Sequence, residues 1–161
     1  MRRYRTLKKG AKYLVYSRVN KKNNLLKPYD VKNLFLKTIK RAKKKYRFSI
    51  KNFVVMDSYF IFIIEPLGEE SLSRIMQWIL SVFAMNYNIK YNEEDHFWRA
   101  RFWSKIIDDI KQYLENFEKV SKEAVKGQKV KEAKNYRFGG LYFILKGIFE
   151  IVDKPDFDIN F

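Results

Sequence analysis

The sequence predicts an α+β domain in which helices pack on a ferredoxin-like antiparallel sheet. First, 47% of the 161 residues are hydrophobic and 17% are aromatic, which is enough for a core and excludes wholesale disorder. Second, the hydrophobic pattern changes along the chain between the two-residue period of strands and the 3.6-residue period of helices. Third, the resulting order is β-α-β-β-α-β-α, which favours an α+β sandwich. We place one domain at residues 1–150 and an acidic tail at 151–161.

The first third of the chain is expected to hold one strand and one helix. Residues 11–19 are rich in β-forming types and alternate between two faces, with Tyr16 and Arg18 on the same face. After a polar loop, residues 31–46 predict a helix with one apolar and one basic face. Asp30 is its expected N-cap, because an Asp side chain accepts a hydrogen bond from the first free N–H groups.

The centre of the sequence predicts two antiparallel strands, at 48–56 and 59–64, joined by a tight polar turn. Both strands are almost wholly apolar. A sheet built from them should therefore be covered on much of both faces.

The second half adds two helices and a short extended segment. Residues 71–88 and 105–122 have the spacing of amphipathic helices. Between them, residues 96–105 (HFWRARFWSK) alternate aromatic and basic side chains, which predicts a strand or extended segment with most of its aromatics in the core. The acidic end, 153–158, either stays solvated or folds back on the basic part of the chain.

The positive charge is concentrated in the first third of the chain. Residues 1–51 hold 19 Lys or Arg residues against one acid, whereas residues 52–161 hold 15 against 17. A uniformly lysine-rich composition would spread its charge along the whole chain. This concentration therefore favours a surface that binds a polyanion, above all nucleic acid, over a merely solvated surface or one that meets an anionic membrane.

The candidate nucleic-acid contacts combine basic side chains for phosphates with one aromatic side chain for stacking on bases. They are Arg2, Arg3, Arg5, Arg18, Lys40, Arg41, Lys44, Lys45, Arg99, Arg101 and Trp103.

Several classes of site are excluded by composition. The chain has no cysteine and a single histidine, His96, so disulfides, thiolate metal sites and multi-histidine sites within one chain are absent. Its longest apolar run, 59–64, is far too short to cross a bilayer, and no signal-peptide hydrophobic region follows the basic N-terminus. We expect a cytoplasmic protein that uses no metal or other cofactor.

Four segments of the sequence together resemble one family, the single-strand-specific tyrosine transposases with the HUH fold, in particular the REP-associated branch. These segments are YLVYSR at 13–18, VMDSYFIFIIEP at 55–66, SLSRIMQW with FAMNYN within 71–88, and DHFWRARFWSKII at 95–107. The resemblance covers about residues 1–140 and is most specific from 71 to 107.

The resemblance implies a catalytic site whose key positions are altered here. Members of this family bind a divalent metal such as Mg²⁺ through an HxH pair and a polar side chain of the last helix, and a tyrosine of that helix attacks the DNA phosphodiester. The pair corresponds to Tyr59 and Ile61, the tyrosine to Lys119, and the polar ligand to Glu123. A different register of the last helix would make Tyr113 the nucleophile.

Three functions follow as alternatives. The leading one is a transposase-like protein that binds single-stranded or hairpin DNA and has lost strand cleavage. The second is an active, metal-dependent nicking enzyme with a displaced nucleophile, such as Tyr113 or Tyr59. The third is a homodimeric protein-interaction module, since family members commonly dimerise through their sheets.

Overall fold

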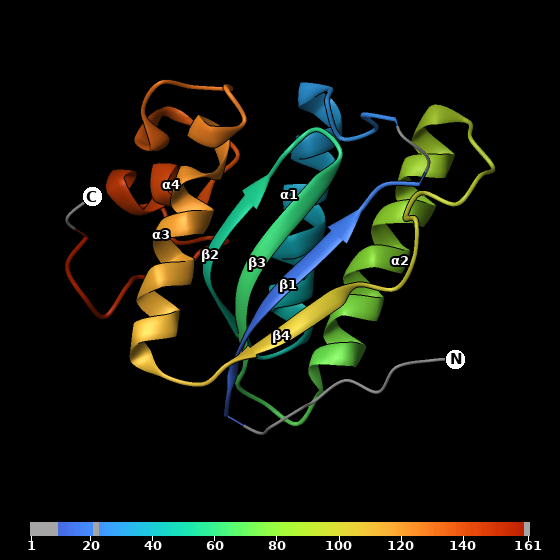
Figure 1. Cartoon of the computed structure of the whole chain (residues 1–161). Coiled ribbons are helices and arrows are strands. Elements are labelled where there is room, and N and C mark those ends of the chain that lie inside the picture. Colours follow the sequence, from blue (N-terminus) through green and yellow to red (C-terminus); the bar gives the residue numbers. More distant parts are fainter. Residues whose placement is uncertain (1–9, 21–22, 160–161) are drawn as a thin grey trace.

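The computed structural model, which describes residues 10–20 and 23–159, contains a four-stranded antiparallel sheet with strand order β2-β3-β1-β4 (Figure 1). The strands are β1 (Lys12–Arg18), β2 (Phe48–Val55), β3 (Tyr59–Pro66) and β4 (Trp103–Ile107). Together with the helices they confirm the predicted α+β fold class and the predicted element order, with a short helical segment and a final helix added at the end.

The helices are divided between the two sides of the sheet. On one side lie α1 (Tyr29–Lys45) and α2 (Leu72–Tyr91), which are behind the strands in the view of Figure 1. Beside β2 lie α3 (Ile110–Lys126), the 3₁₀ segment η1 (Ala133–Asn135) and α4 (Gly140–Lys146). None of the described helices has the length and hydropathy of a membrane span.

The main core lies between the sheet and the pair α1 and α2. The ring of Phe35 in α1 lies 4.9 Å from the ring of Phe60 in β3 and 5.1 Å from that of Phe83 in α2, measured between centroids. All three side chains are completely buried. Because alternate residues of a strand point to opposite faces, Phe62 contacts the same core while Tyr59 and Ile61 face the other side.

The opposite face of the sheet is covered only in part, by α3 over β2. The Asn52 side chain, which is fully buried, donates hydrogen bonds of 2.9 Å to the carbonyl oxygen of Phe117 and to the hydroxyl of Ser121, both in α3. Gly140 makes this arrangement possible, because a Cβ atom at that position would lie 2.3 Å from the Asn52 side-chain oxygen. The polar anchor therefore fixes α3 at one side of the face and leaves β1 and β4 uncovered.

The turn between β2 and β3 holds a buried lysine. Lys32, in α1, donates hydrogen bonds of 2.7 Å to the carbonyl oxygen of Leu26 and 2.8 Å to the Asp57 carboxylate. Burial lowers the pKa of Lys32 against the opposing effect of Asp57. Burial alone would raise the pKa of Asp57, but the hydrogen bonds from Lys129 and Lys32 hold it below its ordinary value.

Two predicted helix starts were wrong. The first helix begins at Tyr29 with Pro28, and not Asp30, at the N-cap position, because the fixed φ of proline suits the entry to a helix. Asp30 lies in the first turn instead, where the helix dipole favours its charge. The helix predicted at 105–122 is α3, and it begins at Ile110. Asp109 caps it there by accepting a 2.8 Å hydrogen bond from the Gln112 N–H.

The strand or extended segment predicted at 96–105 is a paired strand only from Trp103 onward. Only β4 pairs as a strand, and the preceding residues form an irregular segment with one bridge between Val19 and Trp98. The indole N–H of Trp98 donates a 2.9 Å hydrogen bond to the carbonyl oxygen of Leu80 in α2. The segment is therefore held between the end of β1 and α2.

The C-terminal segment folds back on α1, as one of the two predicted alternatives required. Ile151 and Val152 are buried. Asp153 accepts hydrogen bonds of 2.9 Å from Lys43 of α1 and from the Ile50 N–H of β2. The segment that begins at residue 151 therefore packs on the domain and closes part of the outer edge of β2.

Candidate functional site

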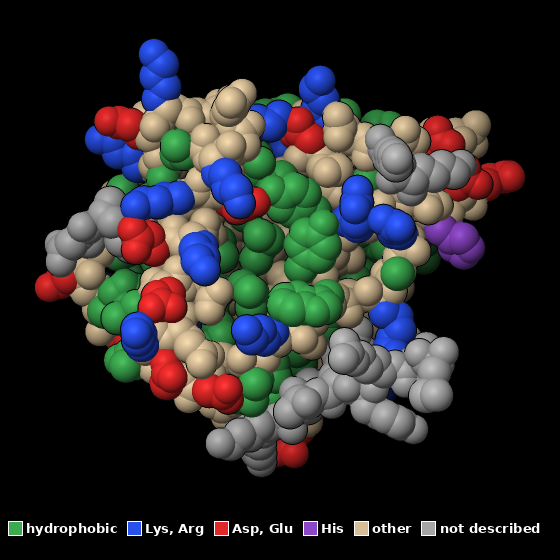
Figure 2. Space-filling view, viewed as in Figure 1, with side chains coloured by type: hydrophobic (Ala, Val, Ile, Leu, Met, Phe, Trp, Pro, Cys, Tyr) green, Lys and Arg blue, Asp and Glu red, His purple; other side chains and the backbone are tan. Residues whose placement is uncertain are grey.

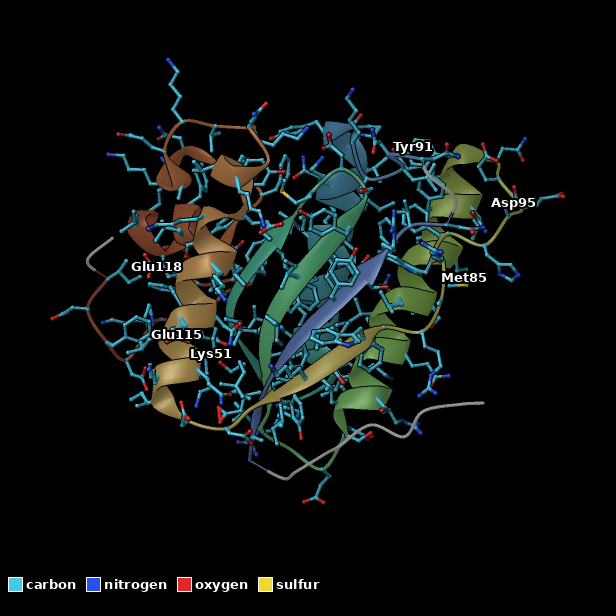
Figure 3. All side chains as sticks on the ribbon, viewed as in Figure 1. Lys51, Met85, Tyr91, Asp95, Glu115 and Glu118 are labelled. Atoms are coloured by element: carbon cyan, nitrogen blue, oxygen red, sulfur yellow. The ribbon has the colours of Figure 1, made fainter. Side chains whose placement is uncertain are left out.

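The uncovered part of the sheet is a mixed aromatic and basic surface, which we call the open face. It consists of outward side chains of β3, β1 and β4: Tyr59, Ile61, Leu14, Tyr16, Arg18, Trp103 and Lys105. Figure 2 shows hydrophobic side chains gathered over this face, with Lys and Arg side chains on either side of them. In Figure 3 it lies between α3, marked by Glu115 and Glu118, and α2, marked by Met85.

Two of the predicted site residues meet at the α3 side of the open face. The Tyr59 hydroxyl donates a 2.5 Å hydrogen bond to the Glu123 carboxylate. Burial and this hydrogen bond raise the pKa of Tyr59 above its ordinary value. Tyr59 therefore keeps its proton at neutral pH and serves as a hydrogen-bond donor.

Ile61 lies beside this pair and carries no ligand atom. Its register partner across β1 is Tyr16, and its partner across β2 is Val54. Among the residues that the structure describes, no three acidic or histidine side chains gather as a set of metal ligands. A divalent metal does not fit here, because Ile61 cannot coordinate it and Glu123 already accepts the proton of a neutral phenol.

The two candidate nucleophile positions differ in exposure. Lys119 is exposed on α3, one helical turn before Glu123, and an amine there cannot form a phosphotyrosine. Tyr113 is 6% exposed, and its ring packs edge-on against Phe117 and Phe157. Burial raises the pKa of Tyr113, and ten residues of helix, about 15 Å, separate it from Glu123. Lys119 therefore offers no phenol at the position that the resemblance implies for the nucleophile, and Tyr113 is buried and distant from Glu123 along α3.

Arg18 and Trp103 lie on the open face, and Arg99 and Arg101 lie near its end. Arg18 is the register partner of Tyr59, and its Nε atom is buried without a hydrogen-bond partner among the described residues. The Arg99 N–H donates a 3.0 Å hydrogen bond to the Arg18 carbonyl oxygen. Arg99 and Arg101 are both exposed, and they stand in the irregular segment before β4 and not in a strand.

The basic residues of α1 lie on the other side of the molecule. Lys40, Arg41, Lys44 and Lys45 belong to the helix that covers the opposite face of the sheet. Lys40 forms a 2.9 Å ion pair with Glu150, and the Arg41 guanidinium lies 5.6 Å from the ring centre of Trp78. They are therefore separated from the open face by the thickness of the sheet.

The remaining candidates, Arg2, Arg3 and Arg5, lie outside the described residues. Conversely, the structure adds Tyr16 and Lys105 to the open face, which were not among the candidates. The strand alternation of residues 11–19 already placed Tyr16 beside Arg18, so the sequence did carry this signal. Lys105 could not be found, because the start of the last strand was misplaced.

Comparisons with known proteins agree with this architecture. The solved structure of a REP-associated tyrosine transposase bound to a REP hairpin matches with a TM-score of 0.78 and 21% identity, over 99% of this chain and 95% of that one. A putative transposase from Deinococcus radiodurans R1 matches with a TM-score of 0.50 and 12% identity, over 72% of this chain and 97% of that one. A search of the curated proteins gave no significant match. The model of the family described as "Transposase IS200 like" matches residues 8–118, and the chain thus belongs to this transposase family.

Proposed function

We propose that this protein binds single-stranded or hairpin DNA and has lost the ability to cleave it. The observation that carries the proposal is the hydrogen bond from Tyr59 to Glu123, on the strand and helix where the family resemblance implies a metal and a nucleophile. In this pair the phenol keeps its proton and the carboxylate accepts it in a hydrogen bond. The pair offers neither a metal site nor a phenolate nucleophile.

Binding is supported by charge and by the related structure. All of the excess positive charge lies in the first 51 residues, and Arg18, Lys105 and Arg99 stand on or beside the open face. The REP-associated relative is bound to a hairpin. Hairpin DNA is accordingly the first ligand to test.

Loss of cleavage is tested by incubating the protein with labelled hairpin DNA and Mg²⁺ or Mn²⁺ and then separating it under denaturing conditions. We expect binding without a covalent protein–DNA adduct. An adduct, or a shortened strand, would overturn the proposal and restore the nicking enzyme. If an adduct formed, Tyr113→Phe and Tyr59→Phe would identify its tyrosine.

The former metal positions can be tested separately from DNA. Residues 59 and 61 point to the same side of β3, so the double variant Tyr59→His with Ile61→His would present two imidazoles beside Glu123. Calorimetric titration with Mn²⁺ should show binding to this variant and none to the natural protein. A double variant that folds but binds no metal would argue against the assigned positions.

The charge contribution to binding is tested by salt. For single-stranded DNA, each neutralised phosphate contributes about −0.7 to the slope of log K against log salt. A complex with about five such contacts should weaken roughly 100-fold between 50 and 200 mM salt. Binding that does not change with salt would contradict a phosphate-based interface.

The proposal includes a homodimer and a cytoplasmic location, the latter because its DNA ligand is found there. The apolar strand at 59–64 is inside the sheet as β3 and is paired on both sides, so it offers no edge to a second copy. Among the described strands, β4 has the outer edge that can pair with a second copy. Sedimentation of the natural protein against Lys105→Pro, which blocks this edge, would test a β4 dimer.

A further inference from the structure

We propose that Tyr16, Tyr59 and Trp103 form a stacking surface for the unpaired bases of a single nucleic-acid strand, on the face where the family resemblance places catalysis. This inference rests on the proposed function, since it concerns how the same protein holds its ligand. It assigns that face a binding role through aromatic rings, with no part for a metal.

The three rings lie on three neighbouring strands. Tyr16 in β1 is the register partner of Trp103 in β4, so their side chains leave the sheet on the same side, with Cβ atoms about 5 Å apart. The Tyr16 and Tyr59 rings are 5.5 Å apart between centroids, tilted by 38°. The result is an aromatic row that runs across the strands from β3 to the edge of the sheet.

This row is not part of the packed core. Trp103 is 51% exposed, and Tyr16 and Tyr59 are half-buried, whereas the aromatic residues that point to α1 and α2 from the same sheet are buried. The helix α3 is anchored over β2 by Asn52 and does not extend across β1. The Tyr59 hydroxyl is held by Glu123, which fixes the orientation of that ring.

Basic groups for phosphates lie along the same row. Arg18 is on the open face next to Tyr59 and is partly exposed, although its Nε atom is buried. Lys105 is exposed on β4, two residues from Trp103 and on the same side of the strand. A strand of nucleic acid laid across the sheet would thus meet rings for its bases and cations for its backbone.

The chemistry of such a surface is well defined. Flat rings stack on the π-face of any base, so binding tolerates different sequences. RNA-recognition modules use a four-stranded sheet in this way, with aromatic side chains that stack two or three bases. The ligand class is therefore unpaired nucleotides, and both DNA and RNA satisfy this chemistry.

The test measures the affinity of the full chain for three probes: an octamer of thymidine, an octamer of uridine, and an octamer of abasic deoxyribose phosphate. The natural protein should bind both base-containing probes more tightly than the abasic one. Tyr16→Ala and Trp103→Ala should each weaken binding of the base-containing probes roughly 5- to 140-fold, with little effect on the abasic probe. Tyr16→Phe and Trp103→Phe keep a ring and should restore the affinity.

The matched control is Leu145→Ala, which removes a side chain of similar exposure, 56%, from α4 at the far edge of the sheet. It should leave all three affinities unchanged. The preference for DNA or RNA follows from the relative affinities for the thymidine and uridine octamers. Equal binding of abasic and base-containing probes, or equal affinity of Trp103→Ala and the natural protein, would overturn the stacking surface.

A hairpin with a fully paired, blunt stem and a loop of abasic deoxyribose phosphate, which has no unpaired bases, separates this inference from the proposed function. If the hairpin binds while the ring variants bind the octamers normally, the stacking surface is wrong and the proposed function stands. If no probe binds, both are wrong. Quenching of tryptophan fluorescence by the thymidine octamer, which should disappear in Trp103→Phe although binding persists, gives a direct reading of stacking on Trp103.

Discussion

The side chains on the two faces of β3 differ in burial, although they alternate along one strand. On one face Phe60, Phe62 and Ile64 are completely buried against the helices, and on the other Tyr59 and Ile61 are half-buried and border the open face. The covered face is held by close packing with many neighbours, so it tolerates little change. The open face carries the positions to which the family resemblance assigns catalysis, and residues there can change while the fold remains. The proposed loss of cleavage would therefore leave the transposase fold intact.

The largest expected effect of a substitution is on the covered face. Phe60→Ala removes a ring that contacts Phe35, Phe62 and Trp98 and leaves a cavity in the core. It should lower the free energy of unfolding by about 3–5 kcal/mol, measured by urea denaturation.

The matched change on the open face is Ile61→Ala, which should cost only about 1 kcal/mol because that side chain is half-buried. Equal losses for the two variants would mean that the open face is covered in solution and would end the comparison.

The next largest loss of stability is expected at Asp57, in the turn between β2 and β3. Asp57→Ala would leave the buried Lys32 ammonium with only carbonyl partners, and should lower the free energy of unfolding by about 3 kcal/mol. Asp57→Asn, which keeps an acceptor without the charge, should cost less. An unchanged midpoint of urea unfolding in Asp57→Ala would show that the ion pair adds nothing.

The same carboxylate makes stability depend on acid. The pKa of Asp57 is lower in the folded protein than in the unfolded chain. Its contribution is therefore complete above the unfolded value, about 4, and is lost as the pH falls through the lower folded pKa. Unfolding midpoints measured from pH 6 to pH 2 should fall less steeply in Asp57→Asn than in the natural protein.

An intermediate effect is expected where α3 covers β2, beside the open face. Asn52→Ala removes two hydrogen bonds to α3 and leaves the Ser121 hydroxyl with one partner fewer, at a cost of about 2 kcal/mol. Hydrogen exchange should show faster opening of α3 than of α1 in this variant. Uniform exchange in both helices would contradict a role for Asn52 as the anchor of α3.

The smallest loss of stability is expected from breaking the hydrogen bond between Tyr59 and Glu123. Tyr59→Phe removes the hydrogen bond to Glu123 but keeps the ring, so the free energy of unfolding should fall by about 1 kcal/mol and stacking of bases should persist. A large loss of stability would mean that this pair holds α3 in place. The affinity of Tyr59→Phe for the thymidine and uridine octamers measures whether stacking persists.

The strands and helices that pack on both sides of the core were predictable from the sequence. Buried strands such as β3 and amphipathic helices such as α1 follow local periods that a single sequence reveals. The limits of β4 and α3 could not be predicted from the sequence. The hydrogen bond from Trp98 to α2 decides where strand pairing begins, and the Asp109 cap decides where the helix starts. These are contacts of particular atoms, which no period encodes.

The site was predictable in part for a similar reason. The resemblance named Tyr59 and Glu123 from segments 64 residues apart, and the structure brings these two side chains into contact. The placement of the basic residues of α1 behind the sheet was not predictable, because charge in a sequence does not tell which face its helix presents. The role of Tyr16 needed the register that places it between Trp103 and Ile61.

The unequal edges of the sheet limit how copies of this chain can assemble. At β2 the edge is partly closed, since Gly139 forms a bridge to Val54 and Asp153 accepts the Ile50 N–H. At β4 the outer edge lacks a partner among the described residues. Because β4 has the only free edge among the described strands, two copies joined there would form a closed pair and could not add further copies into a filament. Such a pair would bring two aromatic rows onto one continuous sheet.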